Sequence, residues 1–290
     1  MPTLGIDLHM HTRYSDGNDT PWQLVMKAAQ QGLQSIAITD HDTVAALPEA
    51  RQAGLVHGLE VVAGVELSVR YEHYHDVHML GYLFDPQDER VLQRLQQLQQ
   101  QRVQRGLEIL TRVNTLLQQR GQLPLDSAAV IQRAHGTLTR PHVAEALIAQ
   151  GYARNIEEAF REFLIPCDVP KAGLSPEEAM ALLAQAGGVC VLAHPGILST
   201  EPQELERLIA TFKAMGMVGV EVYHHSHDAA CVDFLQRCAR RHGLVVTGGS
   251  DYHGRAYGAQ LGEFQTGEAI PAHLLADLQR AQAAVRRESA

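Results

Sequence analysis

The chain has 290 residues, of which 45% are hydrophobic, and its 33 acidic and 24 basic residues give a formal net charge of −9. This balance disfavours a protein that grips long nucleic-acid backbones nonspecifically, although bound divalent cations can reverse the local field for a small phosphorylated substrate. The sequence contains no apolar run near the roughly 20 residues that span a bilayer, no recognisable leader and no CxxC spacing among its four cysteines. We therefore expect a cytoplasmic protein without disulfides that binds neither membranes nor duplex DNA.

Apolar runs alternate with amphipathic segments along most of the chain, which is typical of βα units and a mostly parallel sheet. The first helix is expected to begin at Pro21, with Thr20 as its N-cap. Further helices are expected near 175–187, 201–215 and 227–242. Strands are predicted at residues 3–9, 35–40, 60–67, 76–84, 188–194, 218–223 and 244–251. Seven strands with interleaved helices indicate an α/β barrel, with an open sheet as the alternative.

Residues 88–165 interrupt this alternation. Apolar side chains recur at helical spacing from 92 to 117 in a Gln-rich stretch, and shorter helices are expected to follow, up to "FLIPCDVP". We predict a helical insertion at 88–165 that forms one wall of the active-site mouth, beside a barrel domain made of 1–87 and 166–290. A coiled-coil partner helix is the alternative for the Gln-rich stretch.

Side chains of the metal-ligand type gather at the predicted strand ends, first in "GIDLHMHTRYSDG" at residues 5–17. His9 and His11 are two positions apart, so an extended backbone points both imidazoles to the same side. The residues of this kind are His9, His11, Asp16, His41, Glu66, His78, His194, Asp251 and His253. Each has a packing explanation when taken singly, but a shared metal cluster explains all of them, since the ends of barrel strands converge on one pocket.

Five motifs in register resemble the PHP (polymerase and histidinol phosphatase) family, which lies within the amidohydrolase superfamily. They are HxH at 9–11, "TDHD" at 39–42, "GVE" at 64–66, "AHP" at 193–195 and "GSDYH" at 249–253. The resemblance implies a distorted (β/α)7 barrel of the PHP type. Within the family, "RYSDG", "LTRPHVAEAL" and "EVYHHSH" are similar to the branch of 3′,5′-nucleotide bisphosphate phosphatases and 5′-3′ RNA exonucleases.

The resemblance further implies three divalent ions. The first would be held by His9, His11, Glu66 and Asp251, the second by Glu66 as a bridge with His78 and His194, and the third by Asp16, His41 and His253. A mixed nitrogen and oxygen ligand set suits Mn²⁺, Fe²⁺ or Zn²⁺ better than Ca²⁺ or Mg²⁺, and similar enzymes favour Mn²⁺. Asp40 has two interpretations, as an acceptor that fixes a ligand imidazole or as a cap at the strand end.

The expected chemistry is hydrolysis by a metal-bridging hydroxide, because bound ions lower the pKa of water. The sequence lacks the DxDxT and GxxxxGK[ST] motifs, and we expect no thiol-phosphatase CxxxxxR loop. The leading hypothesis is a phosphomonoesterase that removes the 3′-phosphate of a 3′,5′-bisphosphonucleotide such as adenosine 3′,5′-bisphosphate. A 5′-3′ exoribonuclease on short 5′-phosphorylated RNA, a histidinol-phosphate phosphatase and a non-catalytic PHP binding module are the alternatives.

Candidates for substrate contacts come from positions beside the matched motifs. Asp251 and His225 are the catalytic candidates, with His225 touching phosphate or protonating the leaving oxygen. We expect Arg13, Arg140 and Lys171 to clamp phosphate, although cations are commonly just solvated surface. Tyr223 or Tyr14 would stack on a base, with simple packing as the alternative for both.

Overall fold

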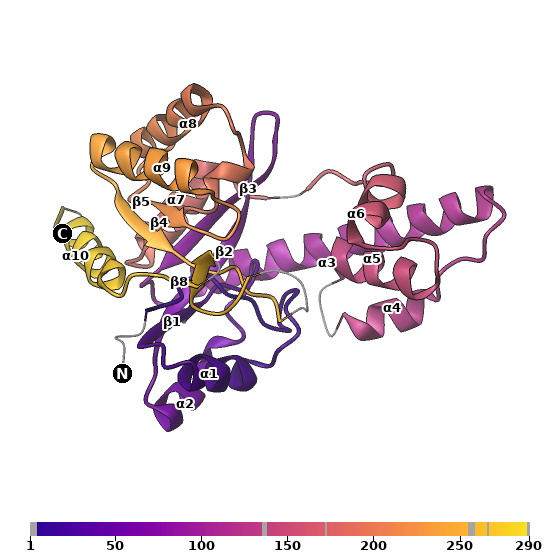
Figure 1. Ribbon diagram of the computed structural model, residues 1–290, viewed down its shortest axis with the longest axis horizontal. Helices are drawn as coiled ribbons and strands as arrows, with labels where there is room; N and C mark the ends of the chain where they lie inside the picture. The colour runs from indigo at the N-terminus through magenta and orange to yellow at the C-terminus, as the bar shows by residue number, and fades with distance from the viewer. Residues whose placement is uncertain (1–4, 135–137, 172, 255–258, 266, 289–290) are drawn as a thin grey trace.

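The protein consists of a barrel body and a helical lobe joined by one long helix (Figure 1). The computed structural model describes residues 5–134, 138–171, 173–254, 259–265 and 267–288. The barrel sheet has six strands in chain order: β1 (Ser35–Ile38), β2 (Glu60–Tyr71), β3 (Tyr74–Tyr82), β4 (Val189–Leu192), β5 (Gly219–Tyr223) and β6 (Val245–Gly248). All six predicted strands after the first are therefore confirmed, with shifts of a few residues at their ends.

The first predicted strand is a segment of single bridges rather than a regular strand, and Thr3 and Leu4 lie outside the described residues. On one side Asp7 N–H donates to Ser35 O at 3.2 Å, and on the other Leu8 N–H donates to Gly248 O at 3.2 Å. Since Ser35 opens β1 and Gly248 ends β6, this segment takes the place of a seventh strand and joins the two edges of the sheet. The predicted α/β barrel is thereby confirmed.

β3 runs antiparallel to both of its neighbours, whereas β1–β2, β4–β5 and β5–β6 are parallel. The reversal comes from a hairpin, because only Glu72 and His73 separate β2 from β3, and Glu72 takes a left-handed φ of 48°. β2 consequently extends past its predicted end at residue 67. The hairpin pairs Ser68 with His78, so a histidine in the middle of β3 lies close to Glu66 in β2.

Four helices of the barrel lie close to their predicted positions: α1 (Pro21–Gln30), α7 (Pro176–Gln185), α8 (Pro202–Ala214) and α9 (Ala229–His242). Two further helices, α2 (Leu47–His57) and α10 (His273–Glu288), were not predicted. Thr20 caps α1 as expected, accepting from the backbone N–H of Gln23 at 3.1 Å. A small ribbon of β7 (Glu263–Gln265) and β8 (Glu268–Ala269) precedes α10. No helix in the described ranges has the length and apolar character to cross a membrane.

The lobe is built on α3 (Glu89–Gln119), with α4 (Ser127–Arg133), α5 (Arg140–Ala149), α6 (Ile156–Ala159) and a π-helical turn at Phe160–Leu164. The first half of α3 packs Leu95 and Leu98 into the barrel core, while its second half packs Ile109 and Leu117 into a separate core with the lobe helices. The far half of the Gln-rich helix therefore has its apolar face covered by helices of the same chain.

Candidate active site

The ligand-type side chains meet at one end of the barrel. His9 and His11 come from the N-terminal segment, His41 follows β1, Glu66 and His78 lie in the hairpin strands, His194 follows β4, and Asp251 and His253 follow β6. Both His194, with φ 27°, and Asp251, with φ 55°, adopt left-handed backbone conformations. Such strain in residues other than glycine persists only where the surroundings impose it, and it concentrates at functional sites.

Four of these residues converge as one ion would require. His11 Nε2 lies 3.0 Å from Asp251 Oδ1 and 3.2 Å from Glu66 Oε2, and His9 Nε2 lies 3.4 Å and 3.5 Å from the same two oxygens. Two ligand atoms each about 2.1 Å from a shared ion stand roughly 3.0 to 3.4 Å apart, for octahedral or tetrahedral geometry. The observed separations match that spacing.

Glu66 faces two groups of histidines with its two oxygens. Oε2 lies 2.9 Å from His41 Nδ1, while Oε1 lies 2.8 Å from His78 Nδ1 and 3.1 Å from His194 Nε2. One buried carboxylate thus has the placement of a bridge between adjacent ions. His78 differs from the other members, since its Nε2 lies 3.0 Å from Lys171 Nζ and is already engaged by a cation.

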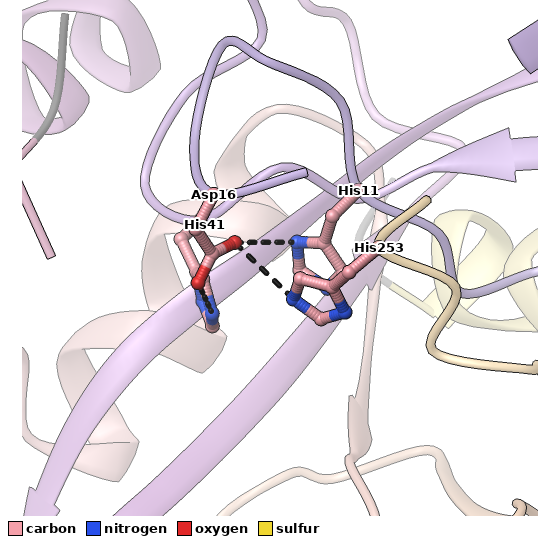
Figure 2. A group of neighbouring side chains, drawn as sticks. All are labelled: His11, Asp16, His41 and His253. Carbon is pink, nitrogen blue, oxygen red and sulfur yellow. Dashed lines mark ion pairs between the residues drawn. The ribbon is translucent and has the colours of Figure 1, made fainter. Parts of the chain in front are cut away.

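A third group surrounds Asp16 (Figure 2). Asp16 Oδ1 lies 3.2 Å from His253 Nε2 and 3.7 Å from His11 Nδ1, and Oδ2 lies 3.8 Å from His41 Nε2. His11 stacks on His253 with ring centroids 4.3 Å apart. The structure therefore brings Asp16, His41 and His253 together, and it places His11 between this group and the first one.

Buried atoms without partners test whether these residues fit metal ions. Within the described part of the chain, His9 Nε2, His11 Nε2, His41 Nδ1 and Glu66 Oε2 make no hydrogen bond although all four are buried. Such groups are costly unless something binds them. His253 Nδ1 lies 2.8 Å from Asp251 O, to which it can only donate, so the lone pair of Nε2 faces Asp16 and the cluster. The donor set and its orientation fit divalent metal ions.

Metal binding at this cluster would also displace protons. Burial acts to raise the pKa of Asp251, but His9 and His253 outweigh it and hold that pKa well below its usual range. Burial acts to lower the pKa of His11, yet the adjacent carboxylates of Asp251 and Glu66 raise it to about 10. The ionised carboxylates thus hold protons on the histidines, and a divalent ion would displace those protons.

Two buried residues that face the candidate ligands escaped the sequence reasoning. Glu221, fully buried in β5, accepts from His9 Nδ1–H at 2.9 Å and from the backbone N–H of His194 at 2.8 Å. His224 is also fully buried, and its Nε2 faces Asp251 Oδ2 at 3.5 Å. Both stand in "EVYHHSH", where a carboxylate in an otherwise apolar strand was the available signal. A carboxylate behind a ligand imidazole fixes its tautomer and orientation.

Asp40 supports the loop of the third group rather than bonding directly to an imidazole. Its carboxylate accepts from Thr12 N–H at 2.7 Å, Thr12 O–H at 2.6 Å and Ser15 O–H at 2.6 Å. Ser15 Oγ in turn lies 3.4 Å from His11 Nδ1. Asp40 therefore reaches a candidate ligand imidazole through one intervening hydroxyl.

The cluster opens into a pocket of about 460 Å³. The opposite wall consists of Arg102 and Arg105 from α3 and Arg140 from α5, and Lys171 lies where the chain returns to the barrel. Arg140 and Lys171 were expected there. Arg102 and Arg105 were missed because they stand among glutamines in α3, and only the tertiary fold shows which face of that helix meets the pocket.

Three other predicted contacts are absent from the lining of this pocket. Arg13 is exposed on the loop after His11, and His225 Nδ1 lies 3.1 Å from Ser250 O. The Tyr223 hydroxyl accepts from Gln236 at 2.8 Å in a groove between α9 and α10. Arg13, His225 and Tyr223 are not among the described residues that line the pocket, and for Tyr223 the placement contradicts base stacking there.

We expected no thiol-phosphatase CxxxxxR loop, but the spacing itself does occur, from Cys231 to Arg237. Both residues lie within helix α9, so they form no phosphate-binding loop. Burial raises the pKa of the Cys231 thiol to about 11, which disfavours the thiolate that such chemistry needs. All four cysteines are free thiols.

A barrel whose strand ends gather imidazoles and carboxylates beneath a cationic wall defines a metal-dependent phosphoesterase. The family model for the PHP domain matches residues 7–164, and the chain belongs to the PHP family.

Relatives of known description carry several activities. The chain is 32% identical over 267 residues to the 3′,5′-nucleoside bisphosphate phosphatase of Chromobacterium violaceum, covering 88% of this chain and 89% of the relative. It is 33% identical over 256 residues to the 5′-3′ exoribonuclease Rnm of Escherichia coli, covering 85% and 84%. It is 32% identical over 254 residues to the phosphoribosyl 1,2-cyclic phosphate 1,2-diphosphodiesterase of Eggerthella lenta, covering 86% and 94%.

The fold agrees with these relatives. A structure from Bifidobacterium adolescentis, provisionally assigned as a metal-dependent phosphoesterase, superposes with a TM-score of 0.82 at 30% identity, covering 97% of each chain.

Proposed function

We propose that this protein is a phosphomonoesterase that removes the 3′-phosphate from 3′,5′-bisphosphonucleotides, releasing the 5′-nucleotide and inorganic phosphate. The observation that carries the proposal is the composition of one pocket. One wall holds the candidate metal ligands, and the other holds four cationic side chains, from Arg102, Arg105, Arg140 and Lys171. A substrate with two separate phosphates matches both walls at once.

The first wall would hold three divalent ions, with Mn²⁺ as the proposed metal, on the three groups around Asp251, Glu66 and Asp16. Bound there, divalent ions supply charge neutralisation at the scissile phosphate and lower the pKa of water. The chain's own part is to keep the ligand lone pairs aimed inward. Glu221 does so for His9 by accepting from its Nδ1–H.

The second wall would hold the phosphate that is not cleaved. Arg105 is itself fixed, because its Nε–H donates to Val169 O and its Nη2–H donates to Asp168 Oδ1, both at 2.6 Å. The Arg140 guanidinium lies 5.4 Å from the centre of the Phe160 ring. Guanidinium groups held in this way bind phosphate oxygens in pairs with little further loss of side-chain entropy.

An apolar part of the same pocket supports a substrate that carries a base. Pro141 and Phe160 from the lobe and Ile197 from the barrel line it, and Ile197 is 52% exposed, unusual for a side chain of this kind. A base placed against these side chains would cover apolar surface, which a bare sugar phosphate would leave exposed.

The test measures kcat/KM of the manganese-loaded wild-type protein and of one variant, each with two substrates. If Arg140 binds the 5′-phosphate, Arg140→Met lowers kcat/KM for adenosine 3′,5′-bisphosphate about 10- to 100-fold, as expected for a lost charge-assisted contact of about 1.5 to 3 kcal/mol. The same variant leaves kcat/KM for 3′-AMP unchanged, since that substrate lacks the 5′-phosphate. Arg154→Met is the matched control, because Arg154 is exposed on the lobe and pairs with Glu158.

The substrate panel also contains 5′-AMP, histidinol phosphate, phosphoribosyl cyclic phosphate and short 5′-phosphorylated RNA. Preference for the bisphosphate supports the proposal. Faster release of mononucleotides from RNA would instead support an exoribonuclease activity. The chain is as similar in sequence to the exoribonuclease Rnm as to the bisphosphate phosphatase. If Arg140→Met lowers kcat/KM equally for adenosine 3′,5′-bisphosphate and 3′-AMP, Arg140 does not bind the 5′-phosphate and the proposed role of the second wall is wrong.

A further inference from the structure

His224 is the one histidine of the pair in "EVYHHSH" that turns toward the metal-ligand cluster. Its ring lies 5.3 Å from that of His194 and 6.1 Å from that of His9, measured between centroids. The residue is completely buried, and among the described residues its Nε2 makes no hydrogen bond. A buried ring nitrogen without a partner, aimed at a cluster of ligands, needs an explanation.

The tautomer of His224 follows from the other ring nitrogen. The backbone N–H of Ser226 donates to His224 Nδ1 at 3.2 Å, and Ser226 Oγ lies 2.8 Å from the same atom. A backbone N–H can only donate, so Nδ1 must present its lone pair. The proton of the neutral ring is then on Nε2, the nitrogen that faces Asp251 Oδ2 at 3.5 Å.

The two oxygens of Asp251 have different surroundings. Oδ1 faces the ring nitrogens of His9 and His11, at 3.4 Å and 3.0 Å. Oδ2 faces the Nε2–H of His224. An N–H group that faces one carboxylate oxygen favours an orientation in which the other oxygen is offered to an ion.

We propose that His224 is a positioning residue that holds Asp251 as a ligand through one oxygen only, an inference that rests on the proposed metal centre and not on the identity of the substrate. His224 is not itself a ligand. Its lone pair is on Nδ1, occupied by Ser226, so Nε2 has a proton to donate and no electron pair for a metal ion.

The test uses two side chains that each reproduce one half of the imidazole. Asparagine places its amide near Nδ1, keeps the acceptor for Ser226 N–H and cannot reach Asp251. Glutamine extends to the position of Nε2 and can donate to Asp251. The measurement is isothermal titration of the metal-free full-length protein with Mn²⁺, giving Kd and the number of ions bound. The unfolding temperature of each metal-free variant reports on folding.

We expect His224→Asn to weaken Mn²⁺ binding about 10- to 100-fold at one site, the range seen when the partner of a metal ligand is lost. His224→Gln restores binding close to the wild-type Kd. His273→Asn, at an exposed histidine of α10 that faces Asp277, is the matched control and leaves Mn²⁺ affinity unchanged. A purely structural role would lower the unfolding temperature of both His224 variants without separating their Kd values.

If His224→Asn binds Mn²⁺ with the wild-type Kd, the proposal is overturned. Loss of one bound ion in both His224 variants also overturns it, by making His224 a ligand. Since Mn²⁺ binding is measured without substrate, failure of the nucleotide specificity leaves this result unaffected.

Discussion

Replacing Glu221 by glutamine changes one charge and almost no volume at the base of the site. Glu221 is fully buried and uses both oxygens, one for His9 Nδ1–H at 2.9 Å and the other for the backbone N–H of His194 at 2.8 Å. Glutamine has a single acceptor oxygen for these two donors. The variant therefore has to sacrifice one of the two hydrogen bonds.

Each choice has a definite cost. If the amide oxygen takes the His194 N–H, the amide NH₂ faces His9 Nδ1, which must become an acceptor and move its proton to Nε2. That proton blocks the lone pair facing Glu66 and Asp251. If the amide oxygen takes His9 instead, two buried donors face each other at His194, at a cost of about 1 to 3 kcal/mol. The first case blocks a candidate ligand atom of His9, and the repulsion in the second case displaces His194, another candidate ligand. We therefore expect Mn²⁺ affinity to fall about 10- to 100-fold, or about 1.4 to 2.7 kcal/mol, in both cases.

The assay is Mn²⁺ titration of the metal-free variant by calorimetry, with bound metal counted after dialysis. Glu206→Gln is the matched control, since Glu206 lies on the surface of α8 and pairs with Arg241. Its removal is expected to change neither metal binding nor stability by more than about 1 kcal/mol. A Glu221→Gln protein that binds the full complement of ions with wild-type Kd would refute the reasoning, because His9 would then need no acceptor behind it.

Three further predictions concern the same end of the barrel. In Gly249→Ala the new Cβ would lie 2.1 Å from His9 Cβ and 2.5 Å from the His9 backbone nitrogen. We therefore expect a stability loss of about 1 to 3 kcal/mol in thermal unfolding, together with weaker Mn²⁺ binding. An unchanged unfolding temperature contradicts this prediction. The pKa of His11 is about 10 without metal, so at any lower pH a proton competes with the ion for this imidazole. We expect Mn²⁺ affinity to rise about tenfold per pH unit for each proton displaced, between about pH 7 and 9. An Mn²⁺ affinity that does not change with pH means that no proton is released and contradicts this prediction. Tyr223→Leu should leave kcat/KM for the bisphosphate unchanged, since Tyr223 packs beside Gln236 outside the pocket, and a large loss would restore it as a substrate contact.

The parts of the fold that sequence predicts well are those fixed by local rules. Thr20 and Pro21 begin α1 as capping chemistry requires, and the alternation of apolar runs identifies every regular barrel strand within a few residues. His9 and His11 share a side for the same local reason, the period of an extended chain. Their joint contacts with Asp251 Oδ1 agree with that reasoning.

The parts that sequence does not predict depend on tertiary contacts. The reversal of β3 comes from a two-residue turn at Glu72 and His73 that carries no glycine or asparagine to announce it. The sequence does not indicate which of His224 and His225 faces the cluster. In the structure His224 accepts from Ser226 N–H, whereas His225 Nδ1 bonds to Ser250 O. Glu221 looks like an ordinary polar residue of a strand until its neighbours are known.

The division of α3 between two hydrophobic cores sets how the lobe can be exchanged or evolve. Its first half is part of the barrel, and Arg102 ties it there by donating to Asp42 Oδ2 at 3.2 Å and to Ser68 Oγ at 3.0 Å. A lobe from a relative, grafted at the start of the helix near residue 88, would remove Leu95 and Leu98 from the barrel along with that tie. The workable junction lies inside the helix, after Arg102. The part of the lobe after Arg102 could then be exchanged to change the substrate range. The barrel and the first half of α3 would keep the metal centre intact.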